Sequence, residues 1–189
     1  MGLLVAALLV WQGSQAAFSA TTRNTRDRWT SGSLSLTNNG GGAGYAATTT
    51  ALFNQANARP GATGTRCLTV RKTGTAAGSL HLYRSALTDS APSLGAQLHL
   101  TITAVPVAAN VRAGCAGFPA AGLTTVATNV ALTALPTSYA AATGPVAVAT
   151  ATQRVAYRIA WTFVSTGTNP GDNALMGKTV SASFTWEMQ

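Results

Sequence analysis

The chain has 189 residues, of which only 8% are charged and 19 are glycine. So few charged residues are not typical of a cytosolic enzyme, and the abundance of Gly and Thr with little Glu or Lys favours strands over helices. The length is sufficient for one domain with a hydrophobic core.

The net charge is +8, from twelve Lys and Arg residues against four acids. A basic surface can hold an anionic wall polymer, an anionic polysaccharide or DNA by counterion release. The simpler interpretation, which we favour, is that the charge keeps the protein soluble, because most arginines are spread along the chain. Only Arg23, Arg26 and Arg28 cluster, and they lack the interleaved aromatic residues of a groove for single-stranded nucleic acid. We expect no specific nucleic-acid partner.

An apolar run at residues 1–10 has the length of a signal-peptide core and is too short to span a bilayer as one helix. Ser14 and Ala16 are small residues where a signal peptidase would cut, which predicts cleavage between Ala16 and Ala17. No Lys or Arg precedes the run, so a retained membrane-proximal anchor is the alternative. The expected division is a signal peptide followed by one extracellular domain, at residues 1–16 and 17–189. The protein would contact a membrane only before the signal peptide is cleaved.

Several stretches in the first part of the chain alternate apolar and polar residues with a period of two, as half-buried strands do. They are residues 29–36, 65–72, 79–84 and 97–105. In the second stretch Leu68 and Val70 share one face, and Thr69 lies on the other. The glycine-rich residues 38–44 predict a flexible loop.

The strongest strand pattern covers residues 154–163, whose apolar face comprises Val155, Tyr157, Ile159, Trp161 and Phe163. Residues 168–173 form a turn cluster, and residues 179–187 close the chain as another alternating strand. The pattern between residues 123 and 150 is too weak to place any element. Many short strands with Gly and Pro turns predict an all-β fold, an antiparallel two-sheet sandwich that is jelly-roll-like and follows an N-terminal signal segment.

Cys67 and Cys115 are the two cysteines of the chain. In an exported protein such a pair most simply forms one disulfide. A metal role for them is not expected, because the two histidines lie far from them in the sequence.

The residues that catalysis requires are missing from the sequence pattern. Hydrolysis by zinc needs three ligands and a general base, but His81 and His99 lie on separate expected strands and no His-Glu-x-x-His motif occurs. Both histidines are expected as exposed residues opposite the leucine faces of their strands. No Gly-x-Ser-x-Gly motif occurs, and the four acids are in expected turns or near a terminus. We expect no catalytic residue, metal or cofactor.

Aromatic residues offer a second kind of function, the binding of a sugar. Tyr157, Trp161 and Trp186 could form a stacking platform, but their spacing with Val and Ile on one face favours the core.

Short motifs along most of the chain resemble the TasA/camelysin family. Residues 17–22, Ala-Phe-Ser-Ala-Thr-Thr, follow the apolar run, and residues 29–36 resemble the family's first strand, an aromatic residue followed by a Ser-Gly-Thr-Leu-x-Leu pattern. Residues 57–66 resemble its Pro-Gly turn, although Ala62 replaces the usual acid. Residues 73–75 match a further turn, and residues 184–187 resemble the closing strand.

The resemblance implies a secreted structural subunit that assembles into fibres of a biofilm matrix or cell surface, as a homo-oligomeric filament. Assembly in that family uses donor-strand exchange, in which the N-terminal segment of one subunit completes a sheet of the next. The residues expected to carry it are Ala17, Phe18, Ser19, Ala20, Thr21 and Thr22. The alternatives are that this segment is the first strand of its own sheet, or that the protein is a monomeric module that binds cell-wall polymer or polysaccharide.

Overall fold

The computed structural model describes residues 33–149 and 152–189. The expected signal peptide, its cleavage point and the expected donor residues 17–22 lie outside this range. The same holds for the first part of the strand expected at residues 29–36.

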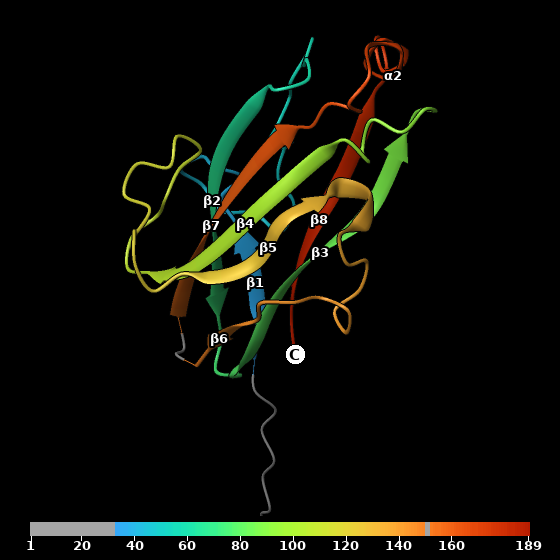
Figure 1. Ribbon diagram of the computed structural model, residues 1–189. Helices are drawn as coiled ribbons and strands as arrows, with labels where there is room; N and C mark the ends of the chain where they lie inside the picture. Colours follow the sequence, from blue (N-terminus) through green and yellow to red (C-terminus); the bar gives the residue numbers. More distant parts are fainter. Residues whose placement is uncertain (1–32, 150–151) are drawn as a thin grey trace, which may run out of the picture. The chain divides into compact units, whose positions relative to one another are not determined.

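The described residues form two antiparallel sheets, which confirms the predicted all-β sandwich (Figure 1). The larger sheet has the strand order β1 (Ser35–Asn38), β2 (Thr63–Thr73), β7 (Thr152–Phe163), β4 (Leu98–Val107) and β5 (Thr124–Ala131). The smaller sheet has the order β6 (Val146–Val148), β3 (Gly78–Asp89) and β8 (Val180–Met188). Jelly rolls have eight strands in two sheets. Here the eight divide unequally, five against three.

Strand β7 lies at the centre of the larger sheet because its inward face is apolar. Val155, Tyr157 and Ile159 are each at most 1% exposed. They belong to one core with residues of the facing sheet, including Leu80 and Leu82. Burial of one such side chain contributes about 1.5–3 kcal/mol, so the alternation in this strand is a strong determinant of the fold. The expected inward face of residues 154–163 is thereby confirmed.

A second, smaller core covers the outer face of the larger sheet. The buried residues Cys67, Val105 and Ala156 of three neighbouring strands pack with Val111, and the partly buried Phe118 adds to the cluster. The last two come from the connection between β4 and β5, which therefore lies across the sheet. The expected disulfide joins Cys67 to Cys115 of the same connection and ties it to β2.

The glycine-rich segment after β1 is held by hydrogen bonds, although the sequence predicts a flexible loop there. The Asn39 side chain is buried, donates to the carbonyl groups of Gly42 and Val111, and accepts from the N–H groups of Gly41 and Thr69. Gly41 has a φ of 78°, which favours glycine, and a Cβ there would lie 2.8 Å from that of Ala113. The segment is thus a fixed loop.

Other sequence expectations need correction at their boundaries or in kind. The first described strand is Ser35–Asn38, so it extends two residues beyond the expected end at residue 36. The turn cluster at residues 168–173 contains a short helix, α2 (Asn169–Ala174), capped by the Thr168 side chain. The unplaced stretch between residues 123 and 150 contains β5, the short helix η2 (Leu132–Ala134) and β6.

Candidate functional site

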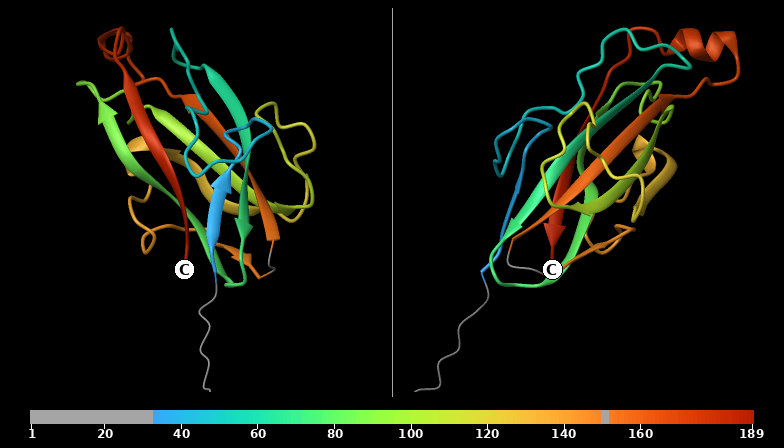
Figure 2. Two further views of the ribbon diagram at one scale, coloured as in Figure 1. Left: turned by 180° about the vertical axis from the view of Figure 1, so that it is seen from behind. Right: turned by 90° about the vertical axis from the view of Figure 1, so that its left-hand side faces the viewer.

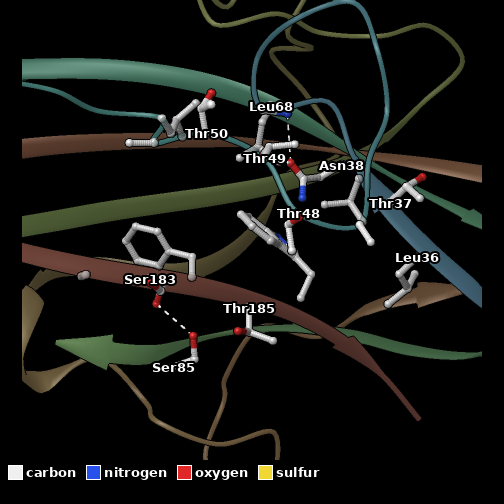
Figure 3. Close-up of a pocket in the computed structure, with 18 residues that line it drawn as sticks. Leu36, Thr37, Asn38, Thr48, Thr49, Thr50, Leu68, Ser85, Ser183 and Thr185 are labelled. Atoms are coloured by element: carbon white, nitrogen blue, oxygen red, sulfur yellow. Dashed lines mark hydrogen bonds between the residues drawn. The ribbon is translucent and has the colours of Figure 1, made fainter.

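A groove of about 520 Å³ lies between the β1 side of the larger sheet and β8 of the smaller one (Figure 3). Three segments line it: β1 with the start of the following loop, residues 47–52 of that loop, and residues 182–186 of β8. Leu68 and Val70 of β2 and Ser85 of β3 complete the lining. The groove therefore connects the two sheets along one open side of the sandwich.

The groove exists because the smaller sheet is narrower than the larger one. Neighbouring strands are about 4.8 Å apart, so two missing strands leave about 10 Å of the larger sheet without a facing strand. Strand β8 is the last strand of the smaller sheet on this side, and β1 pairs with β2 instead of β8. Figure 2 shows β1 and the free side of β8 on the same side of the sandwich.

The side of β8 that faces away from β3 has no strand partner among the described residues. An edge strand directs alternate N–H and C=O groups away from its sheet. In the described part of the chain, residues 181–187 of β8 make ladder bonds to β3 and no backbone hydrogen bond to the loop at residues 47–52. The loop lines the groove without completing the sheet. One further strand would satisfy these groups.

The lining of the groove is uncharged. Its lining contains no Asp, Glu, His, Lys or Arg, so it offers no general acid, general base or cation. Apolar side chains, among them Leu36, Leu52, Phe184 and Trp186, provide much of its surface, together with hydroxyl groups of Ser and Thr. An extended, uncharged peptide fits this chemistry.

Two polar atoms beside the groove have no hydrogen-bond partner among the described residues. They are the indole Nε1 of Trp186, which lines the groove, and the hydroxyl of Tyr157, whose ring meets the Trp186 ring edge-on at 5.7 Å. Burial raises the pKa of the Tyr157 phenol, so it stays protonated. Tyr157 is only 1% exposed and belongs to the core, as expected, and Trp161 and Trp186 are partly buried and pack against that core.

The two histidines lie on different sheets, as the separate strands predict. The His81 ring on β3 stacks on Tyr139, with centroids 4.1 Å apart, and His99 Nδ1 on β4 lies 3.1 Å from Asn129 Oδ1. Both are half-buried rather than exposed. The described residues contain no cluster of three or more His, Cys, Asp or Glu residues that could hold a metal ion. Among them no helix is long and apolar enough to cross a membrane.

Glu187 takes part in a polar cluster on the outer face of the smaller sheet. From the sequence it was expected only as an acid near the terminus. The Tyr83 hydroxyl donates to Glu187 Oε2 at 2.7 Å, and Gln189 Nε2 donates to Oε1 at 2.8 Å. These bonds, the first above all, lower the pKa of the Glu187 carboxyl. Because its folded-state pKa is depressed, the stability it contributes is present above the unfolded-state pKa and is lost as the pH falls through the folded-state pKa.

We expect Tyr83→Phe to raise the pKa of Glu187 toward its ordinary value, because the largest of its stabilising hydrogen bonds is removed. A ¹³C NMR titration of the Glu187 carboxyl measures this. Tyr139→Phe is the matched control, since that hydroxyl donates to the Ser79 carbonyl on the same sheet and does not touch Glu187. An unchanged Glu187 pKa in Tyr83→Phe, or an equal rise in both variants, would contradict the assignment.

The residues expected from the sequence to carry self-assembly, 17–22, lie outside the described residues, so their contacts are not part of the site described above. The groove itself was not predicted from the sequence. A comparison with protein-family models gives no match, and a comparison with curated proteins gives none either. The likeness to TasA/camelysin proteins therefore rests on the sequence motifs alone.

Proposed function

We propose that the protein is a secreted structural subunit that self-assembles into extracellular or cell-surface fibres by donor-strand exchange. Residues 17–23 of one copy add a strand beside β8 of the next. The observation that carries the proposal is the free edge of β8 beside an uncharged, largely apolar groove. A free edge and a row of apolar pockets are what strand addition uses.

The donor segment and the groove match in chemistry. Residues 17–22 carry no charged side chain, and neither does the lining of the groove. Their association therefore desolvates no charged side chain, a step that costs several kcal/mol per charge, and the α-amino group of Ala17 and the Arg23 side chain lie at the two ends of the donor segment. In an extended segment Phe18, Ala20 and Thr22 point to the same side, so they would face the groove together.

The length of chain between donor and domain permits exchange between copies. Residues 24–34 connect the donor segment to β1, and eleven residues span at most about 40 Å when fully extended. This reach allows the segment to enter either its own groove or that of a neighbour. Cleavage before Ala17 would give a donor with a free end, which can thread along β8.

A charge placed on the edge of β8 tests the proposal. Ser183 lines the groove, whereas Ser181 lies on the same exposed row of β8 outside it. In protein that begins at Ala17, we expect Ser183→Lys to prevent filaments, because it places a charge in the groove lining where the strand would add. Ser181→Lys should leave the filaments, because Ser181 lies outside that lining. Negative-stain electron microscopy measures the filaments.

Both lysine variants should fold like the unmodified protein, since surface substitutions change stability by about 0.5 kcal/mol or less. Circular dichroism checks this. Filaments from Ser183→Lys as abundant as those from Ser181→Lys would show that the β8 edge is not the acceptor. Monomers from the unmodified protein at all concentrations would favour the monomeric module that binds wall polymer or polysaccharide.

A further inference from the structure

Residues 47–53 lie beside the groove with few hydrogen bonds. They follow an isolated bridge between Asn38 and Ala46, and residues 47–52 line the groove together with β1 and β8 (Figure 3). Among the described residues, no backbone group of residues 47–53 takes part in a hydrogen bond. One side-chain bond, from the Thr49 hydroxyl to Asn38 Oδ1 at 2.8 Å, holds the middle of the segment. The segment therefore lacks the ladder bonds that fix a strand.

Leu52 and Phe53 are the large apolar residues of this segment. Both are partly buried and pack against the main core. Leu52 also lines the groove, on the side where the smaller sheet ends at β8. The segment thus shields part of the core from water at the place where a further strand of the smaller sheet would cover it. Such contacts depend on apolar area rather than on direction, so another apolar segment can replace them.

The segment is similar in composition to the expected donor strand. Residues 47–53 read Ala-Thr-Thr-Thr-Ala-Leu-Phe, and residues 17–22 read Ala-Phe-Ser-Ala-Thr-Thr. Each consists of Ala, Ser or Thr with one or two large apolar residues, and neither carries a charged side chain. The two segments therefore suit the same uncharged groove.

We propose that residues 47–53 occupy the acceptor site of the monomer and are displaced when a donor strand adds beside β8. This inference rests on the proposed function and adds its regulation. In the closed form, with Leu52 and Phe53 packed on the core, the site is covered, so only the fraction of molecules that has released the segment accepts a donor. The donor replaces the apolar contacts and adds ladder bonds to β8, which residues 47–53 do not make.

The balance between the two segments sets the protein concentration at which filaments form. The apparent affinity of the site for a donor is reduced by the fraction of molecules in the open form. Weaker contacts of residues 47–53 therefore favour assembly, although they also make the monomer less stable. A residue that belongs to the permanent wall of the groove has the opposite effect, because its loss weakens the contacts with the donor.

Two leucines of the groove test this difference in sign. In protein that begins at Ala17, the half-assembly concentration is the total concentration at which half of the chain sediments as filaments. Leu52→Ala should lower it at least about threefold, because the variant loses part of the apolar area that holds the closed form. Leu36→Ala is the matched control and should raise it at least about threefold, because Leu36 lines the same groove from β1, which stays paired with β2. Circular dichroism checks that both variants fold.

A second pair of variants changes no large apolar side chain. Thr49→Val removes the hydroxyl that bonds to Asn38 and keeps the shape of the side chain. It should lower the half-assembly concentration about two- to tenfold, the usual effect of one hydrogen bond. Thr50→Val, whose hydroxyl makes no hydrogen bond among the described residues, should leave the half-assembly concentration unchanged.

The outcomes separate this inference from the proposed function. A half-assembly concentration that rises in Leu52→Ala as it does in Leu36→Ala would show that Leu52 is a permanent wall of the groove and would overturn the inference alone. No change in both Leu52→Ala and Thr49→Val would do the same. The absence of filaments from the unmodified protein at every concentration would overturn the proposed function, and the inference with it.

Discussion

Removal of residues 18–22 is expected to abolish filaments while leaving a folded monomer. The physical reason is that residues 33–149 and 152–189 contain two paired sheets and a hydrophobic core. In the proposed assembly, the deletion removes only the segment that would add as a strand beside β8 of the neighbouring copy. Electron microscopy of protein that begins at Ala17, with and without the deletion, measures the filaments. Thermal unfolding measures the fold.

A synthetic peptide of residues 17–23 provides the control for this deletion. Added to the deleted protein, it should bind in the groove and raise the melting temperature, because a ligand that binds only the folded state stabilises it. A peptide with Phe18→Asp should not, since it would bring a charge into an uncharged groove. Unfolding of the deleted protein would instead make the segment an ordinary strand of its own sheet.

The sequence was most informative where a strand has one buried face. In β7 the inward residues Val155, Tyr157 and Ile159 are nearly inaccessible, so their spacing alone indicates a strand and its orientation. The outer face of the same strand was less predictable. Ala156 is fully buried there because Val111 and its neighbours cover it, and that contact joins residues far apart in the chain.

The alternation fails in the stretch between residues 123 and 150 for a local reason. The pairing of β5 with β4 shifts register twice, and Asn129 within β5 has a φ of 52°, so inward and outward positions lose their period of two. Strand β6 has only three residues. Helix α2, which lies outside this stretch, was missed for a different reason. It has six residues, with Pro and Gly near its start, and is too short to show a helical period.

The groove could not be predicted because it reflects the smaller number of strands in the smaller sheet. β1 and β8 lie near the two ends of the described chain, and their sequences do not reveal that β1 pairs with β2 rather than with β8. Part of the lining of the groove could be predicted from the sequence. Trp186 was expected in the core, and both it and Phe184 pack against the core at a place where no facing strand covers them completely.

Reduction of the Cys67–Cys115 disulfide is expected to lower the free energy of unfolding by about 3–4 kcal/mol. The two cysteines are 48 residues apart, and closing a loop of that length restricts the unfolded chain by about 4 kcal/mol in the entropy model. Urea unfolding of the oxidised and reduced protein, at equal concentration and pH, measures the difference. Because both forms have the same sequence, the comparison removes the disulfide without replacing the Cys67 side chain by a smaller one.

The double variant Cys67→Ala/Cys115→Ala should be less stable still than the reduced protein. Cys67 is fully buried, so its replacement also removes contacts with Val105 and Ala156. Alanine is preferable to serine because a buried hydroxyl without a partner would add a penalty of its own. If reduction left the urea midpoint unchanged, the connection between β4 and β5 would be held by Val111 and the Thr69 hydroxyl, which bonds to both backbone groups of Val111, rather than by the disulfide.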